Sequence, residues 1–215
     1  MIRTLIKSAL PAALAVTLAV TLAVTLAACS TTPTHYYTLL PSAELAALPA
    51  QDPLLQFEIA SVDVPPQVDI PQIVVRLGGG AVAPVETRRW IGPLASEIRL
   101  ALGAALSAQL NAPDVSGVAA DSTLPLYRIQ LRVRRFDSAL GTSAQIEAAW
   151  TIRDVRDAQR AVTCESKASV TVAPGYEALA GGHQRALVEI ATGIGKALLA
   201  VKAGRTTSAC AEAAP

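Results

Sequence analysis

Cys29 is the residue whose chemistry the surrounding sequence defines most closely in this chain of 215 residues. It directly follows Leu-Ala-Ala at 26–28 and precedes a polar Ser/Thr/Pro stretch. A basic start with Arg3 and Lys7 comes first, and an apolar run over 8–28 follows it. A charged start, an apolar run and small residues are typical of a cleaved secretory signal. We therefore predict that residues 1–28 are a signal peptide and that the Cys29 thiol accepts a diacylglycerol.

The segment that ends at Cys29 resembles the bacterial lipoprotein signal. The alternative is an N-terminal transmembrane anchor, because the apolar run is almost long enough to cross a bilayer. A cysteine at the end of the run, just before a polar stretch, favours lipidation, and several acyl chains give stable attachment. Ser30 is not the aspartate that retains enterobacterial lipoproteins at the inner membrane. The resemblance therefore implies the periplasmic face of the outer membrane.

The two other cysteines, Cys164 and Cys210, form an even pair in a chain that is predicted to be exported. Disulfides persist in such oxidising compartments. Cys164 falls in a predicted strand and Cys210 in a polar tail that nothing else in the sequence holds in place. We predict a Cys164–Cys210 disulfide; the alternative is two free thiols.

The remaining reactive residues do not match a catalytic or metal-binding motif. Of the two histidines, His35 lies near the lipidation site and His183 lies on the apolar face of a predicted helix. A hydrogen-bonded core residue is expected at His183, and the alternative is a base in a site assembled by tertiary folding. The Gly-Ile-Gly-Lys sequence at 193–196 lacks the flanking residues of a phosphate-binding loop. We therefore expect a protein that is not an enzyme and has no resident metal or cofactor.

The charge pattern excludes a nucleic-acid-binding protein and marks one basic strand. The net charge is +1, whereas nucleic-acid binders carry a basic excess on one face. Arg128, Arg132 and Arg134 alternate with apolar residues in a predicted strand over 126–136. We predict that they form a solvated sheet face or that they contact acidic lipid head groups or an acidic partner loop.

The elements that must position these residues follow from the apolar periodicity. The predicted order β-ββ-α-βββ-α gives an α+β fold, with a mostly antiparallel sheet packed against two helices on one face. The signal precedes a lipidated tether over 29–53, a domain over 54–202 and a tail over 203–215. An aromatic piece of the tether at 35–40 is either a short strand or an interfacial patch. The predicted strands are 54–64, 73–77, 81–85, 126–136, 143–154 and 160–172, and the predicted helices are 93–111 and 176–202.

Several short motifs, taken in their order and spacing, resemble one family. They are Tyr36-Tyr-Thr-Leu39, Pro71-Gln-Ile-Val-Val-Arg76, Trp90-Ile-Gly-Pro-Leu94, Glu147-Ala-Ala-Trp150 and Gly175-Tyr176. Together they are similar to the auxiliary lipoproteins of ABC-type transport systems, the PqiC-like family. The resemblance covers almost all of residues 29–202.

The resemblance implies a non-catalytic periplasmic lipoprotein of the outer membrane. Its expected partners are an MCE-domain protein, which forms a lipid conduit across the periplasm, and an inner-membrane permease and ATPase. Self-association into a homo-oligomer is also implied, as is a role in envelope integrity. The alternative function is an independent periplasmic lipoprotein that binds a small apolar or lipid ligand.

Overall fold

A computed structural model describes residues 32–40, 52–157 and 159–213. The chain divides into two compact units, Met1–Pro33 and Thr34–Pro215. The predicted signal peptide and Cys29 lie outside the described residues. Among the helices that the structure describes, none is both long and apolar enough to cross a membrane.

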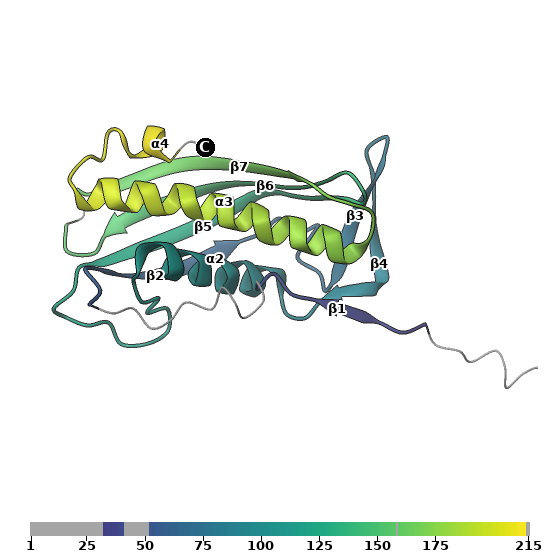
Figure 1. The fold of residues 1–215 in the computed structure, drawn as a ribbon, viewed down its shortest axis with the longest axis horizontal. Helices are drawn as coiled ribbons and strands as arrows, with labels where there is room; N and C mark the ends of the chain where they lie inside the picture. Colours follow the sequence, from purple (N-terminus) through teal and green to yellow (C-terminus); the bar gives the residue numbers. More distant parts are fainter. Residues whose placement is uncertain (1–31, 41–51, 158, 214–215) are drawn as a thin grey trace, which may run out of the picture. The chain divides into compact units, whose positions relative to one another are not determined.

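The larger of the two sheets in the second unit has four strands (Figure 1). Its strands follow the order β2-β5-β6-β7, in which β5, β6 and β7 are antiparallel neighbours and β2 pairs in parallel with β5. Buried and exposed residues alternate along β5 and β6, as expected for strands with one face against a core. The bounds are β2 Gln56–Asp63, β5 Leu126–Ala139, β6 Ser143–Asp154 and β7 Ala161–Thr171.

The remaining strands form a second sheet, whereas the sequence predicted one. Its order is β1-β4-β3, with β1 (His35–Tyr37), β3 (Gln72–Gly78) and β4 (Ala81–Trp90). Soon after β2, Pro65-Pro66 removes two backbone donors, and the chain leaves the first sheet there. The β3–β4 hairpin instead packs near the far end of β5, where Arg76 makes an ion pair with Asp137 at 2.7 Å. The α+β class is confirmed.

The predicted aromatic strand near the N-terminus is also confirmed. β1 pairs in parallel with the end of β4, so that Tyr37 lies opposite Trp90. This pairing takes part of the predicted tether into the fold. Residues 30–34 are then the segment between Cys29 and the first strand.

Two long helices pack on the same face of the four-stranded sheet and against each other (Figure 1). α2 (Leu94–Leu110) buries the stripe Leu94, Ile98, Leu102 and Leu106, and Asn111 ends it in a left-handed conformation with φ of 46°. α3 (Tyr176–Lys202) has the predicted bounds. A short helix, α4 (Ala209–Glu212), was not predicted and lies in the tail.

Gly181 and Gly182 are neighbours in α3, and replacing each with alanine is expected to change the stability of the protein in opposite directions. A Cβ at Gly182 would lie 2.3 Å from Cγ1 of Val172 and 3.0 Å from Cβ of Ala144, which are both buried. A Cβ at Gly181 would meet no atom nearer than 3.6 Å, at Nη1 of Arg185. We expect Gly182→Ala to lower the free energy of unfolding by about 1–3 kcal/mol. Gly181→Ala is expected to raise it by up to about 1 kcal/mol, because alanine favours the helix.

Urea unfolding of the two variants beside the unmodified protein measures both effects. The Gly181→Ala variant is the matched control, since the helix propensity gained is the same at both positions. Equal stability of the two variants would contradict the close approach of α3 to the sheet at Gly182.

Candidate functional site

Three of the sequence motifs meet where the second sheet reaches the start of α2. The Trp90 amide donates to the Pro71 carbonyl at 2.8 Å, and the Ile91 amide donates to the Tyr37 carbonyl at the same distance. These bonds join the ends of β1, β3 and β4 directly before Leu94 begins α2. Segments that lie far apart in the sequence therefore build one site.

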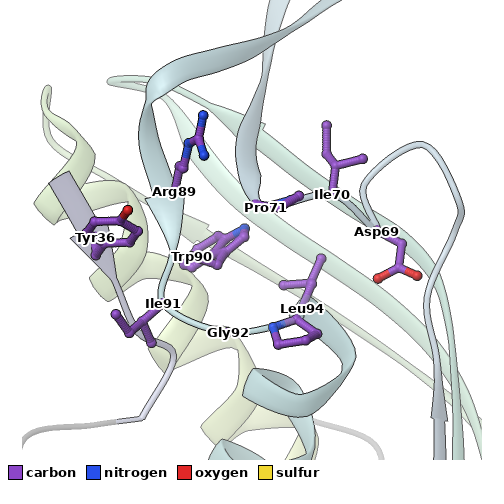
Figure 2. Close-up of a pocket in the computed structure, with 10 residues that line it drawn as sticks. Tyr36, Asp69, Ile70, Pro71, Arg89, Trp90, Ile91, Gly92 and Leu94 are labelled. Atoms are coloured by element: carbon purple, nitrogen blue, oxygen red, sulfur yellow. The ribbon is translucent and has the colours of Figure 1, made fainter. Parts of the chain in front are cut away.

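An open apolar cleft of about 430 Å³ lies at this junction, and we call it the N-terminal cleft. Figure 2 shows Tyr36 and Ile91 on one side, Ile70 and Asp69 on the other, and Trp90 between them. The Tyr36 side chain is 58% exposed and Ile91 is 61% exposed, whereas Trp90 is buried. The cleft is lined by Tyr36, Asp69, Ile70, Pro71, Arg89, Trp90, Ile91, Gly92, Pro93 and Leu94.

The backbone beside the cleft is fixed by two buried or half-buried side chains from the helices. The Glu97 carboxylate on α2 accepts from the Thr38 hydroxyl at 2.7 Å and from the Leu39 amide at 2.8 Å. The Gln184 amide on α3 donates to the carbonyls of Thr38 and Leu40 at 3.0 and 3.1 Å. The segment that follows β1 is therefore bound to both helices.

Glu97 was missed by sequence reasoning, although a signal for it exists. It lies on the buried face of α2, between Leu94 and Ile98, where an apolar residue is the norm. A buried carboxylate requires hydrogen-bond donors, and here the donors come from a segment 58 and 59 residues away. Gly92 leaves room for it, because a Cβ there would lie 3.1 Å from Oε1 of Glu97.

His183 is a core residue, as predicted. Its Nε2 lies 2.8 Å from the Ser138 hydroxyl, and its ring stacks on Phe136 with centroids 4.1 Å apart. Burial lowers the pKa of His183 from 6.5 to about 3, so the ring is neutral at physiological pH. Nδ1 has no hydrogen-bond partner among the described residues, so no carboxylate orients the ring as in a catalytic triad.

The glycines of the Gly-Ile-Gly-Lys sequence at 193–196 serve helix packing. Gly193 and Gly195 lie inside α3, where a Cβ at Gly193 would lie 2.8 Å from the Ala213 carbonyl oxygen and one at Gly195 would touch α2. Among the described residues, no group of three His, Cys, Asp or Glu side chains is placed to hold a metal ion.

The three arginines of the basic strand each lie beside a carboxylate of the same sheet, on the neighbouring strand β2 for Arg128 and Arg132 and on β7, beyond β6, for Arg134. Arg128 pairs with Glu58, Arg132 lies 3.9 Å from Asp63, and Arg134 lies 2.8 Å from Glu165. They occupy exposed positions of β5, alternating with its buried positions. Each of these positive charges therefore has a negative charge beside it on the exposed face of the sheet, and a contact with head groups or with a partner stays a prediction.

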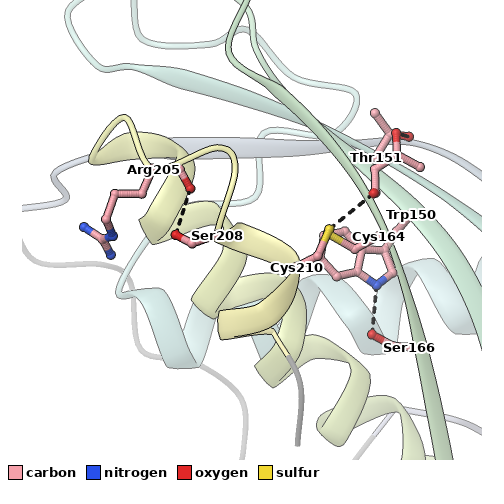
Figure 3. The surroundings of a disulfide bond; sticks show 8 residues. Trp150, Thr151, Cys164, Ser166, Arg205, Ser208 and Cys210 are labelled. Atoms are coloured by element: carbon pink, nitrogen blue, oxygen red, sulfur yellow. Dashed lines mark hydrogen bonds between the residues drawn. A yellow bond between two sulfur atoms is a disulfide. The ribbon is translucent and has the colours of Figure 1, made fainter.

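Cys164 on β7 and Cys210 in α4 are joined by a disulfide in the structure, with their Cα atoms 5.4 Å apart (Figure 3). Ala209 and Ala213, on either side of Cys210, are buried. Arg205 and Glu212 make an ion pair at 3.1 Å that closes the loop before α4. The C-terminal tail is therefore packed against α3 and β7.

Two solved structures share this fold. One is described as an uncharacterized protein, with a TM-score of 0.60 and 17% identity, and the match covers 78% of this chain and 99% of that one. The other is a Xanthomonas campestris protein of the family DUF330, with a TM-score of 0.56 and 20% identity, covering 81% of this chain and 97% of that one. No curated protein matches the sequence.

A family model described as ABC-type transport auxiliary lipoprotein component matches residues 37–195. The match begins at the last residue of β1 and ends inside α3. It therefore includes the other strands of both sheets and all of α2. It confirms the resemblance that the sequence motifs indicated. The chain therefore belongs to the family of ABC-type transport auxiliary lipoprotein components.

Proposed function

We propose that the protein is a non-catalytic lipoprotein of an MCE-type ABC lipid transport system, held in the outer membrane by Cys29. In this role it docks the trans-periplasmic MCE assembly, whose inner-membrane end is a permease and an ATPase, and supports envelope integrity. The family supports the transport role. One structural observation carries the docking role: residues 35–40, soon after Cys29 in the sequence, are hydrogen-bonded to β4, α2 and α3. A membrane anchor attached there holds the whole domain in place.

The short linker keeps the domain close to the membrane. From Cys29 to His35 the chain advances by six residues, which extend to at most about 20 Å. A flexible linker of the full predicted tether length would reach further and would hold the domain loosely. A short linker suits a component that must receive a partner at a fixed height above the bilayer.

The tip of the β3–β4 hairpin is the element that we assign to partner contact. Leu77 is 66% exposed and Val82 is 53% exposed, on either side of the glycine turn. Exposed apolar residues at the end of a hairpin are accessible to a protein partner, which would remove them from water. β4 has ten residues, so the tip lies about 30 Å along the strand from Trp90 and the N-terminal cleft.

Site-specific photo-cross-linking in cells tests this function. We place a photoreactive residue at Leu77 in the full-length protein, and at Val155 as an exposed control at the β6–β7 turn. Recovery of an MCE-domain protein with the Leu77 probe, and not with the Val155 probe, is the expected result. Self-association is read from cross-links between copies of the chain. Outer-membrane fractions in which neither probe captures an MCE-domain protein would contradict the docking role.

The alternative function, binding of a small apolar or lipid ligand, is favoured by the N-terminal cleft, whose walls are mostly apolar. Native mass spectrometry of the detergent-extracted protein separates the two functions. A monomer that carries one copurified lipid supports ligand binding. A lipid-free oligomer supports docking.

A further inference from the structure

We propose that the N-terminal cleft is the surface on which the domain rests on the bilayer, with Tyr36 and Ile91 in the interfacial layer of the anchoring leaflet. This proposal rests on the lipidation of Cys29 put forward above. It adds an orientation: the domain does not tumble at the end of its anchor, and one defined face meets the lipid.

The position of the cleft relative to the anchored end of the chain is the first argument. Tyr36 belongs to β1, which begins six residues after Cys29, so this strand lies within about 20 Å of the lipidated residue. Ile91 is next to β1, because its amide is bonded to the Tyr37 carbonyl. The apolar side chains nearest to the anchor in the chain are therefore those around the cleft.

The chemistry of the rim is the second argument. Tyr36 and Ile91 are each more than half exposed, and both line the same cleft. Exposed apolar residues that share a cleft mark a contact surface more clearly than single ones do. A tyrosine ring with its hydroxyl at the polar edge suits the interface between head groups and acyl chains. Arg89 on the same rim lies half-buried, and its guanidinium donates to the Glu86 carbonyl at 3.1 Å and lies 3.7 Å from the Glu86 carboxylate. Asp69 is the acidic group on the opposite side.

The rigidity of the support is the third argument. The hydrogen bonds from Glu97 and Gln184 hold the segment after Tyr37 in one position. Trp90, below the rim, packs edge-on against Phe136 with centroids 6.0 Å apart. A fixed apolar rim enters a bilayer without first losing conformational freedom. The contact therefore sets the direction in which the hairpin tip projects from the membrane.

Nitroxide accessibility in the lipidated, full-length mature protein tests the proposal. Ile91→Cys and Val155→Cys each add one free thiol, since the other cysteines are acylated or paired. Each variant is spin-labelled in vesicles of phosphatidylethanolamine with some phosphatidylglycerol, and intact mass verifies the acyl chains. Relaxation by oxygen, which concentrates in lipid, is compared with relaxation by a water-soluble nickel chelate. We expect the oxygen-to-nickel ratio at position 91 to exceed that at position 155 by about threefold or more.

Three outcomes would overturn the proposal. An acylated protein with equal ratios at both positions shows that the cleft faces water, while the anchoring function stands. A label at Ile91 that is shielded only after an MCE-domain protein is added makes the cleft a protein-docking surface. A mature protein whose mass shows no acyl chains on Cys29 removes both the anchoring function and this orientation.

Discussion

Replacing Cys164 and Cys210 together with alanine is expected to lower the free energy of unfolding by about 4 kcal/mol. The two residues are 46 positions apart, and the unfolded chain gains the freedom of that loop when the cross-link is lost. The tail is expected to detach, because α4 packs against the domain through small side chains and the Arg205–Glu212 ion pair lies within the tail itself. Urea unfolding and hydrogen exchange of residues 205–213 measure the two effects.

The single variant Cys210→Ser provides the matched control, since it also removes the cross-link and is expected to lose a similar free energy. Adding reductant to the unmodified protein is expected to have the same effect. Alkylation without reductant is expected to leave the mass of the mature protein unchanged. A gain of two alkyl groups would show that the thiols are free and would contradict the prediction.

The second large effect is a loss of stability in acid that depends on His183. Burial lowers the pKa of His183 from 6.5 to about 3. Between these pH values the unfolded chain binds a proton at His183 that the folded chain does not, so lowering the pH favours unfolding. The contribution is fully present above pH 6.5 and is lost progressively toward pH 3, in total roughly 4–5 kcal/mol. His183→Gln is expected to remove this part of the pH dependence.

Urea midpoints between pH 7 and pH 4 measure this slope. The variant His35→Gln is the control, because His35 lies exposed on β1 and is expected to keep the slope of the unmodified protein. Carboxylates contribute to acid sensitivity in all three proteins, so the difference between the curves is the quantity compared. A His183→Gln curve parallel to the unmodified one would contradict the assignment.

The elements with strong local signals were predicted well. α3 and β6 have the predicted bounds, because a long apolar stripe and a clear alternation are flanked by turn residues. α4 was missed, since its four residues, Ala-Cys-Ala-Glu, show no periodicity. The split into two sheets was also missed. It depends on parallel pairing between β1 and β4 and between β2 and β5, and such partners lie far apart in the sequence.

The sequence supplied the motifs that line the N-terminal cleft, but it predicted no site there. Residues of the motifs around Tyr36, Pro71 and Trp90 all line the N-terminal cleft. The sequence does not indicate that these motifs lie side by side. They are joined by hydrogen bonds between backbone groups, which every residue type can form. The carboxylates that approach the arginines could not be predicted either, since contacts between strands depend on strand order and register. Cys29 lies outside the described residues, and its lipidation stays a prediction.

The attachment of β1 also has a mechanical consequence. With Cys29 lipidated as we propose, a force on its acyl chains enters the described part of the domain along β1, whose backbone is bonded in parallel to β4. The bonds from Glu97 and Gln184 follow within the next few residues. A force along β1 loads the hydrogen bonds between β1 and β4 together, in shear, so that they do not open one after another. The fold therefore spreads traction from the membrane over one sheet and two helices before it reaches the surface that a partner would grip.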